Sequence, residues 1–142
     1  MADMTNSAAV KAAAVSALRA QQMRMRIISE NLANANSTSR TPGGDPYRRQ
    51  VPVFEPTKVG ERGAQVEGVK MTRVIPDQSD FRSEYEPGHP GADAQGYVKT
   101  PNVDPLIEAL DMREAQRAYE ANLNVIETAR AMDMRTLELL RK

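Results

Sequence analysis

Residues 102–142, NVDPLIEALDMREAQRAYEANLNVIETARAMDMRTLELLRK, decide the fold. Asp104 is a good N-cap residue, and Pro105 suits the first position of a helix. No glycine or proline follows up to the end of the segment. Two neighbouring apolar stripes therefore predict one long helix, with a face broad enough to contact more than one partner helix. The two stripes consist of Tyr119, Leu123, Ile126, Leu137 and Leu140, and of Ala115, Ala118, Val125, Ala129, Met132 and Leu139.

A second long helix is predicted at the other end of the chain. The alanine-rich run from Ala8 to Ala20 has high helix propensity. Apolar residues recur at alternating steps of four and three, which is a heptad pattern. All eight glycines and eight of the nine prolines lie between Pro42 and Pro101, so the first helix is expected to end before Pro42. The heptad stripe consists of Ala14, Leu18, Met25, Ile28, Leu32 and Ala35.

The middle of the chain offers little regular structure. Residues 66–75 are the best strand candidate, and residues 47–54 are a weaker one because Pro52 favours an edge strand or an extended arm. Residues 77–94 are polar and rich in glycine and proline, which predicts a loop. This region is expected to form one small β-hairpin at best.

We therefore predict a mainly α fold. Its long N- and C-terminal helices pack as a coiled-coil hairpin, with a small β-hairpin or extended insertion between them. The expected divisions are the N-terminal helix of a core domain in residues 1–40, the insertion in residues 41–101, and the C-terminal helix of the core domain in residues 102–142.

Composition excludes several classes of function. The 142 residues contain no cysteine and one histidine, which rules out disulfides, thiolate metal sites, cysteine catalysis and His-rich metal sites. No apolar run approaches the ~18 residues that span a bilayer. The N-terminus lacks the continuous apolar stretch of a cleaved secretory signal, so any export is expected to use another route. We expect no catalytic residue, no cofactor and no metal ligand.

The charges are balanced overall but unevenly distributed. The chain has 19 basic and 19 acidic residues. Residues 1–60 carry eight basic and four acidic side chains, a net charge of +4, so the remainder is net −4. The basic segment is expected to meet the acidic one, in the same chain or in a neighbour. Ordinary solvated charge is the alternative.

Three groups of polar residues are interpreted as having no catalytic, metal-binding or nucleic-acid-binding role. His89, in a polar loop, is expected to be solvated. The acidic residues of the same region lack the spacing of a calcium loop and are interpreted as a solvated acidic loop. A modest basic patch is expected to be solvated or to form intersubunit salt bridges rather than to bind nucleic acid. The acidic residues are Asp77, Asp80, Glu84 and Glu86, and the basic patch is Arg40, Arg48 and Arg49.

The predicted apolar faces are wider than the chain itself can cover. Two helices packed only on each other have little interior, and the middle region supplies few large apolar residues. We expect other subunits to complete these faces, either in a dimerising antiparallel hairpin or in a larger assembly. The expected assembly interface is Leu18, Met25, Ile28, Leu32, Asn31, Asn34, Asn36, Tyr119, Asn122, Leu123, Ile126, Met132, Leu137 and Leu140.

Within this set, two groups of polar residues leave alternatives open. Asn31, Asn34 and Asn36 are hypothesised to bridge the helix end to the following loop through bonds from side chains to backbone. The alternative is helix capping alone. Tyr119 and Asn122 are expected in the intersubunit interface, and the alternative is packing within one hairpin.

Motifs at both ends resemble a known family. Residues 31–36, NLANAN, resemble the N-terminal motif of flagellar axial proteins. Residues 41–49 (TPGGDPYRR), 96–98 (GYV) and 101–104 (PNVD) resemble C-type rod proteins of the flagellar basal body, and residues 112–122 (MREAQRAYEAN) are similar to the C-terminal helix of rod and hook proteins. The chain thus resembles the flagellar basal-body rod protein family.

The resemblance implies a structural subunit of the proximal rod, a hollow helical drive shaft that crosses the periplasm, transmits torque from the motor to the hook and lets exported subunits pass. It also implies export through the flagellar type III apparatus without a cleaved signal. The implied partners are copies of the same chain, the B-type and F-type rod proteins, the adaptor joining the rod to the membrane ring, and the export apparatus, with no nucleic acid and no small-molecule substrate. The rival class is a cytosolic coiled-coil adaptor that binds nucleic acid through its arginines, and an enzyme ranks third.

Overall fold

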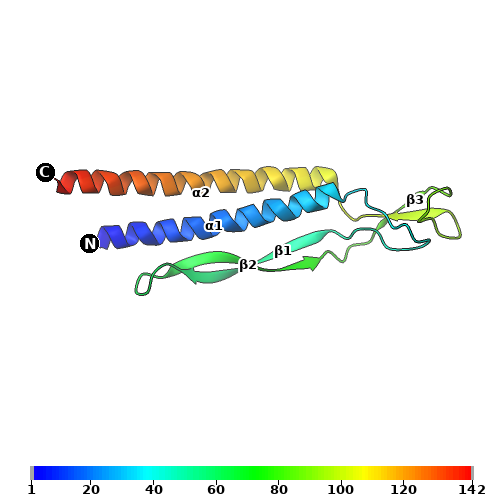
Figure 1. Ribbon diagram of the computed structural model, residues 1–142, viewed down its shortest axis with the longest axis horizontal. Coiled ribbons are helices and arrows are strands. Elements are labelled where there is room, and N and C mark those ends of the chain that lie inside the picture. The colour runs from blue at the N-terminus through cyan, green and yellow to red at the C-terminus, as the bar shows by residue number, and fades with distance from the viewer. Residues whose placement is uncertain (1, 142) are drawn as a thin grey trace. The chain divides into compact units, whose positions relative to one another are not determined.

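The computed structural model describes residues 2–141, and it contains two long helices separated by short strands (Figure 1). The predicted pair of helices and the small strand insertion are confirmed. The chain clusters into two compact units. One takes in the chain up to Met25, residues 53–73 and residues from 113 onward; the other takes in residues 26–52 and 74–112. The elements are α1 (Ala2–Ala33), β1 (Gln50–Val59), β2 (Val66–Pro76), β3 (Arg82–Tyr85), β4 (Tyr97–Thr100) and α2 (Pro105–Leu140).

The start of α2 follows the predicted capping pattern. Pro105 is the first residue of the helix. The Asp104 carboxylate accepts a hydrogen bond from the backbone N–H of Leu106 at 3.0 Å, and the Asp104 carbonyl accepts one from the N–H of Glu108 at 3.0 Å. An N-cap that satisfies otherwise unpaired helix donors fixes where the helix begins.

In the first unit, α1 contacts α2 on one face and the sheet of β1 and β2 on another (Figure 1). Lys11 of α1 forms a 2.5 Å salt bridge with Asp133 of α2. On the sheet side, the Ser16 hydroxyl accepts a hydrogen bond from the N–H of Val69 at 3.2 Å. A side chain at Gly68 would place its Cβ 2.5 Å from the Ser16 oxygen, so glycine permits this close approach.

The interior of the first unit is thin. All of its buried apolar residues are alanines, and an alanine side chain removes little apolar surface from water. These residues are Ala9, Ala14, Ala20, Ala115 and Ala129. The first unit therefore has only small apolar residues in its interior, and those of its large apolar side chains that the structure describes are half-buried or exposed.

The second unit contains a hairpin that the sequence prediction missed. β3 pairs antiparallel with β4, from Arg82 opposite Thr100 to Tyr85 opposite Tyr97. The two tyrosine rings meet edge to face, with centroids 5.3 Å apart. The prediction of a plain loop over residues 77–94 is wrong here, because all four residues of β3 are exposed and show no apolar alternation.

β1 and β2 form the other two-stranded sheet, joined through residues 60–65. A connection this short requires antiparallel strands. β1 is longer than predicted and contains Pro52 and Pro56. In a two-stranded sheet each strand has one edge that faces away from its partner. Proline has no N–H to donate, so it is tolerated where its nitrogen lies on that outer edge.

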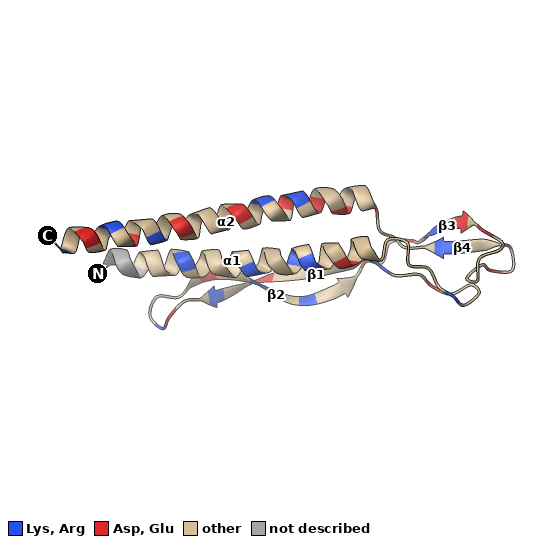
Figure 2. Ribbon diagram, turned by 45° about the horizontal axis from the view of Figure 1, so that its top comes forward, with Lys and Arg blue, Asp and Glu red and all other residues tan. Residues whose placement is uncertain are grey.

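Figure 2 shows the charged residues distributed along the ribbon. Several salt bridges within the chain join the basic N-terminal half to the acidic C-terminal half. Arg24 lies 3.3 Å from Glu114, and Arg49 bonds to Glu108. The Lys11 ammonium lowers the pKa of the Asp133 carboxyl. The expected meeting of opposite charges therefore takes place inside one chain.

Candidate functional site

The most prominent surface of the first unit is the apolar side of α2. Ala115 and Ala129 form its buried strip. Helical spacing of 3.6 residues per turn places large apolar residues on both sides of this strip. We define the first flank as Leu123, Met134 and Leu137, which are 38, 59 and 52 % exposed, and the second flank as Val125, Met132 and Leu139, which are 42, 62 and 73 % exposed.

Such a surface is costly in water. Burying one leucine or methionine side chain contributes about 1.5–3 kcal/mol, and large exposed apolar patches mark interaction sites. Since the alanine strip already faces the chain's own interior, the two flanks are free for other molecules. Two flanks on opposite sides of one helix can serve two neighbours at once.

A further apolar group lies at the start of α2, in the second unit. Leu106, Ile107 and Leu110 are all more than half exposed, whereas Glu108 between them is fully buried. The sequence prediction missed this group because it begins before the two long stripes. The spacing of these residues on one side of a capped helix was the available signal.

The predicted interface residues divide between covered and open positions. Those on α1 lie against the chain itself, with Ile28 and Asn31 buried and Leu18, Met25 and Leu32 half-buried, and Asn34 in the turn after α1 is also half-buried. Tyr119, Asn122 and Ile126 on α2 are also half-buried. The open positions are Asn36, Leu123, Met132, Leu137 and Leu140.

Asn31 ties the end of α1 to the chain that enters β1, in the second unit. Its amide donates to the carbonyl of Gln50 at 2.9 Å, and its carbonyl oxygen accepts from the Gln50 N–H at 2.9 Å and from the Tyr47 hydroxyl at 2.8 Å. Burial and the nearby Glu30 raise the pKa of Tyr47, which keeps this hydroxyl a donor. The hypothesised bridge from helix to loop is therefore present at Asn31.

The other two asparagines behave differently. The Asn34 amide donates to the carbonyl of Glu30 at 2.9 Å, which caps the helix, and its oxygen accepts from the Ser37 hydroxyl at 3.0 Å. Asn36 is exposed, and no hydrogen bond joins its side chain to another described residue. Bridging to backbone thus belongs to Asn31, capping belongs to Asn34, and the bridging hypothesis is wrong for Asn36.

We expect the Asn31→Ala variant to be less stable by about 2–3 kcal/mol, because it leaves the Gln50 backbone and the Tyr47 hydroxyl without a partner. Asn34→Ala should cost about 0.5–1.5 kcal/mol for its cap, and Asn36→Ala should change stability by less than about 0.5 kcal/mol. Urea titration followed by circular dichroism measures all three. Equal losses in the three variants would contradict the distinct role of Asn31.

Arg49 is the centre of a charge cluster in the second unit. Its guanidinium bonds to the buried Glu108 and lies 3.2 Å from Asp77 and 3.7 Å from Asp111. The N–H of Ser79, together with the Ser79 hydroxyl and Arg49, lowers the pKa of the Asp77 carboxyl. One cation therefore neutralises part of the charge of three carboxylates.

Arg48, the neighbour of Arg49, is also occupied inside the chain. Its guanidinium stacks 4.1 Å above the Phe81 ring and donates to the carbonyls of Asp77 and Ser79 at 2.7 and 3.1 Å. The prediction that this patch is solvated or pairs with another subunit is therefore wrong for Arg48 and Arg49. Both arginines hold their own chain together and are not free for phosphate groups.

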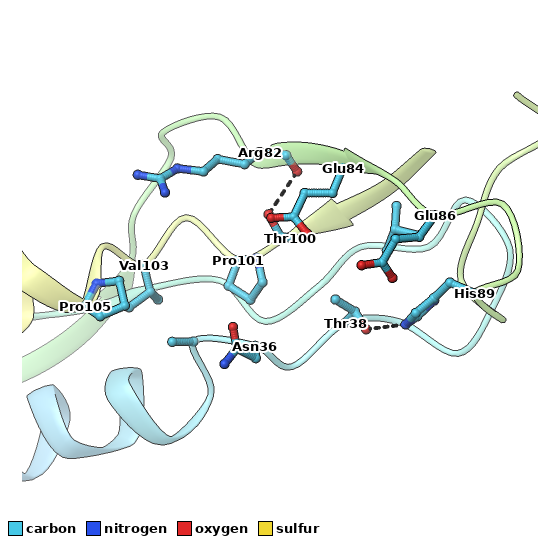
Figure 3. A pocket seen from close by; sticks show the side chains of 12 residues that line it. Asn36, Thr38, Arg82, Glu84, Glu86, His89, Thr100, Pro101, Val103 and Pro105 are labelled. Carbon is cyan, nitrogen blue, oxygen red and sulfur yellow. Dashed lines mark hydrogen bonds between the residues drawn. The ribbon is translucent and has the colours of Figure 1, made fainter. Parts of the chain in front are cut away.

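A polar pocket of about 360 Å³ lies in the second unit (Figure 3). His89 is half-buried at its wall rather than solvated as predicted. Its Nδ1 accepts from the N–H of Gly91 at 2.8 Å, and its Nε2 lies 3.1 Å from the Thr38 hydroxyl. Because Nδ1 is an acceptor, the neutral ring carries its proton on Nε2. His89 thus joins two loops and is fully engaged as a structural group.

Two features limit other kinds of site in the part of the chain that the structure describes. Among the side chains of residues 6–141, no three or more His, Asp or Glu are grouped so as to hold a metal ion. Neither of the helices found there is long and apolar enough to cross a membrane.

Comparison with known proteins yields one consistent family. Residues 12–40 match the family described as flagella basal body rod protein, and residues 94–139 match the C-terminal region of the flagellar basal body rod FlgEFG proteins. The chain is similar to flagellar basal-body rod protein FlgC of Agrobacterium fabrum, with 50 % identity covering 95 % of each chain. It is 44 % identical to FlgC of Escherichia coli (87 % of this chain, 90 % of the relative) and 37 % identical to FlgC of Bacillus subtilis (87 % and 91 %).

Proposed function

This chain belongs to the FlgC family of flagellar basal-body rod proteins, and on that premise we propose that it builds the proximal rod by helical self-assembly. It is a structural subunit of the rod, located in the flagellar basal body, and not an enzyme. As a member of this family it assembles with other components of the basal body.

The observation that carries the proposal is the pair of open apolar flanks on α2. A contact between two different surfaces of identical subunits can be repeated from one subunit to the next, and it produces a helical filament where the repeat does not close into a ring. The thin alanine interior of the first unit supplies little stability of its own. Assembly would supply the missing burial.

The packing of the two helices supports a coiled-coil hairpin as the core of the subunit. α1 has a heptad pattern, and the buried apolar residues of the first unit are alanines, which would allow the two helices to approach closely. Residues 1–40 and 102–142 would form this axial core domain, and residues 41–101 would brace adjacent subunits. A wall of such interlocked helices would be stiff enough to transmit torque across the periplasm.

We further propose the immediate neighbours in the rod. They are other copies of this chain, the B-type and F-type rod proteins, and the adaptor that joins the rod to the membrane ring, with delivery by the flagellar export apparatus. The interface would include the open positions Leu123, Met132, Leu137 and Leu140, with the half-buried Tyr119, Asn122 and Ile126 beside them.

Deleting the gene tests the proposal. Basal bodies purified from the deletion strain should end at the membrane ring without a rod, and a plasmid copy should restore the rod and swimming. Electron microscopy of the purified basal bodies measures this outcome. Complete rods in the deletion strain would overturn the proposal.

A further inference from the structure

A groove in the first unit lies between α1 and the strands β1 and β2. It has a volume of about 410 Å³, and its apolar lining comes from both the helix and the sheet. Three cationic residues, Arg19, Lys58 and Lys70, stand at the groove, and all three are exposed. None of the salt bridges found among residues 2–141 involves them. The apolar lining residues are Ala20, Met23, Val59, Val69 and Met71.

The first flank of α2 has the opposite charge along its edge. Glu120, Glu127 and Glu138 are separated by seven and eleven residues, so the helical repeat places them in one row beside Leu123, Met134 and Leu137. All three glutamates are exposed. Arg130 lies on the same flank, so the stretch from Glu120 to Glu138 has a net charge of −2, while Arg113 and Arg141 lie in line with the flank beyond its two ends. The second flank is bordered instead by the cations Arg117 and Arg135.

We propose that the first flank of α2 in one copy docks into the groove between α1 and β1–β2 of a second copy. This inference rests on the proposed function, because it specifies one contact through which the rod would grow. The groove has a net charge of +3 and the flank between Glu120 and Glu138 a net charge of −2, and each has an apolar centre. The second flank, edged with arginines, would meet like charge in the groove and is rejected.

A single chain cannot make this contact with itself. Its α2 packs on α1 around Lys11 and Ala14, whereas the groove uses Ser16, Ala20 and Met23, which the helical repeat places on another face of α1. The flank and the groove are also different surfaces, so the contact is heterologous, and an assembly that does not close into a ring keeps a free flank and a free groove at its two ends.

The apolar centre and the charged rim have separate roles. Burial of the leucine and methionine side chains provides most of the affinity. Exposed ion pairs contribute little each, but complementary rims steer the approach and select the register. Reversing the rim charges should therefore weaken assembly, and restoring complementarity should rescue it.

Crosslinking in purified basal bodies tests the pairing. The chain has no cysteine, so two single-cysteine variants can be produced together, one of them tagged. We expect a bismaleimide to join Lys58→Cys in one copy to Glu120→Cys, Glu127→Cys or Glu138→Cys in another. The matched controls Arg117→Cys and Arg135→Cys, on the border of the second flank, should not crosslink to Lys58→Cys. Basal bodies that hold both variants but lack the expected crosslink, or that crosslink only the controls, would overturn the inference.

A charge exchange provides an independent test. Lys58→Glu with Lys70→Glu should reduce the number of completed rods by about tenfold, since two favourable exposed pairs become repulsive. Adding Glu120→Lys and Glu127→Lys to the same gene should restore most of that loss, and failure to restore it would contradict the pairing. Intact rods without the crosslink would defeat only this inference, whereas rods in the deletion strain would defeat the proposed function itself.

Discussion

Replacing Arg49 with methionine should destabilise the purified chain by about 3–5 kcal/mol at neutral pH, because it leaves a buried carboxylate without its cation. Glu108 is fully buried and bonds to Arg49, and Asp77 and Asp111 lie close to the same guanidinium. Methionine preserves much of the side-chain volume, so the decrease in the free energy of unfolding reports the missing charge and hydrogen bonds. Urea titration followed by circular dichroism measures the free energy of unfolding.

The matched control is Arg26→Met, which removes an exposed salt bridge to Glu30 within one helix. That change should cost less than about 0.5 kcal/mol. A loss below about 1 kcal/mol for Arg49→Met would contradict a stabilising role of the cluster.

The same variant should show a distinct dependence on pH. The pKa of Asp77 is lowered in the folded chain, so its stabilising contribution is present above the unfolded value of ~3.9 and is lost as the pH falls through the folded value. In Arg49→Met the carboxylates can take up protons instead of repelling one another. The difference in unfolding free energy from the parent chain should therefore shrink in acid, and a difference that grows in acid would be inconsistent with this explanation.

Placing a charge on the first flank should stop rod growth without blocking secretion. Leu123 is 38 % exposed, so Leu123→Glu can keep its own fold while carrying a carboxylate into the contact with the neighbouring subunit. An unpaired charge buried in an apolar contact costs several kcal/mol, more than one interface can lose. Swimming in soft agar, basal-body microscopy and detection of the secreted subunit measure the result. Ile126 lies beside this flank and is half-buried, and Ile126→Glu is also expected to stop rod growth.

Asn124→Glu is the control for this prediction, since Asn124 is exposed on α2 and lies outside both flanks. It adds the same charge to the same helix and should swim normally. Normal motility of the Leu123→Glu strain would show that the first flank is not part of the rod interface.

The long helices could be predicted from sequence because their signals are local. The Asp104-Pro105 pair, the absence of breakers and the apolar repeat act within a few turns of the chain. The hairpin of β3 and β4 could not be predicted, because β3 itself shows no strand pattern. Residues 86–96 separate the two strands in the sequence, and their pairing and the contact between Tyr85 and Tyr97 form only in the folded chain.

The interface itself stays a prediction. Helical spacing assigned Leu123, Met132, Leu137 and Leu140 to it, and all four side chains are exposed in the single chain. The role of Arg49 was not visible in the sequence, because its partners lie 28, 59 and 62 residues away and meet only in the folded chain. His89 was misjudged for the same reason, since its Thr38 partner is 51 residues distant.

Solvent access to the first flank, before and after assembly, tests the central claim most directly. A single cysteine at position 137, introduced as Leu137→Cys into this cysteine-free chain, can be labelled with a maleimide in the purified subunit and in purified basal bodies. We expect rapid labelling of the free subunit and strong protection in the basal body. Equal labelling rates in both would show that no neighbour covers the flank and would contradict the account.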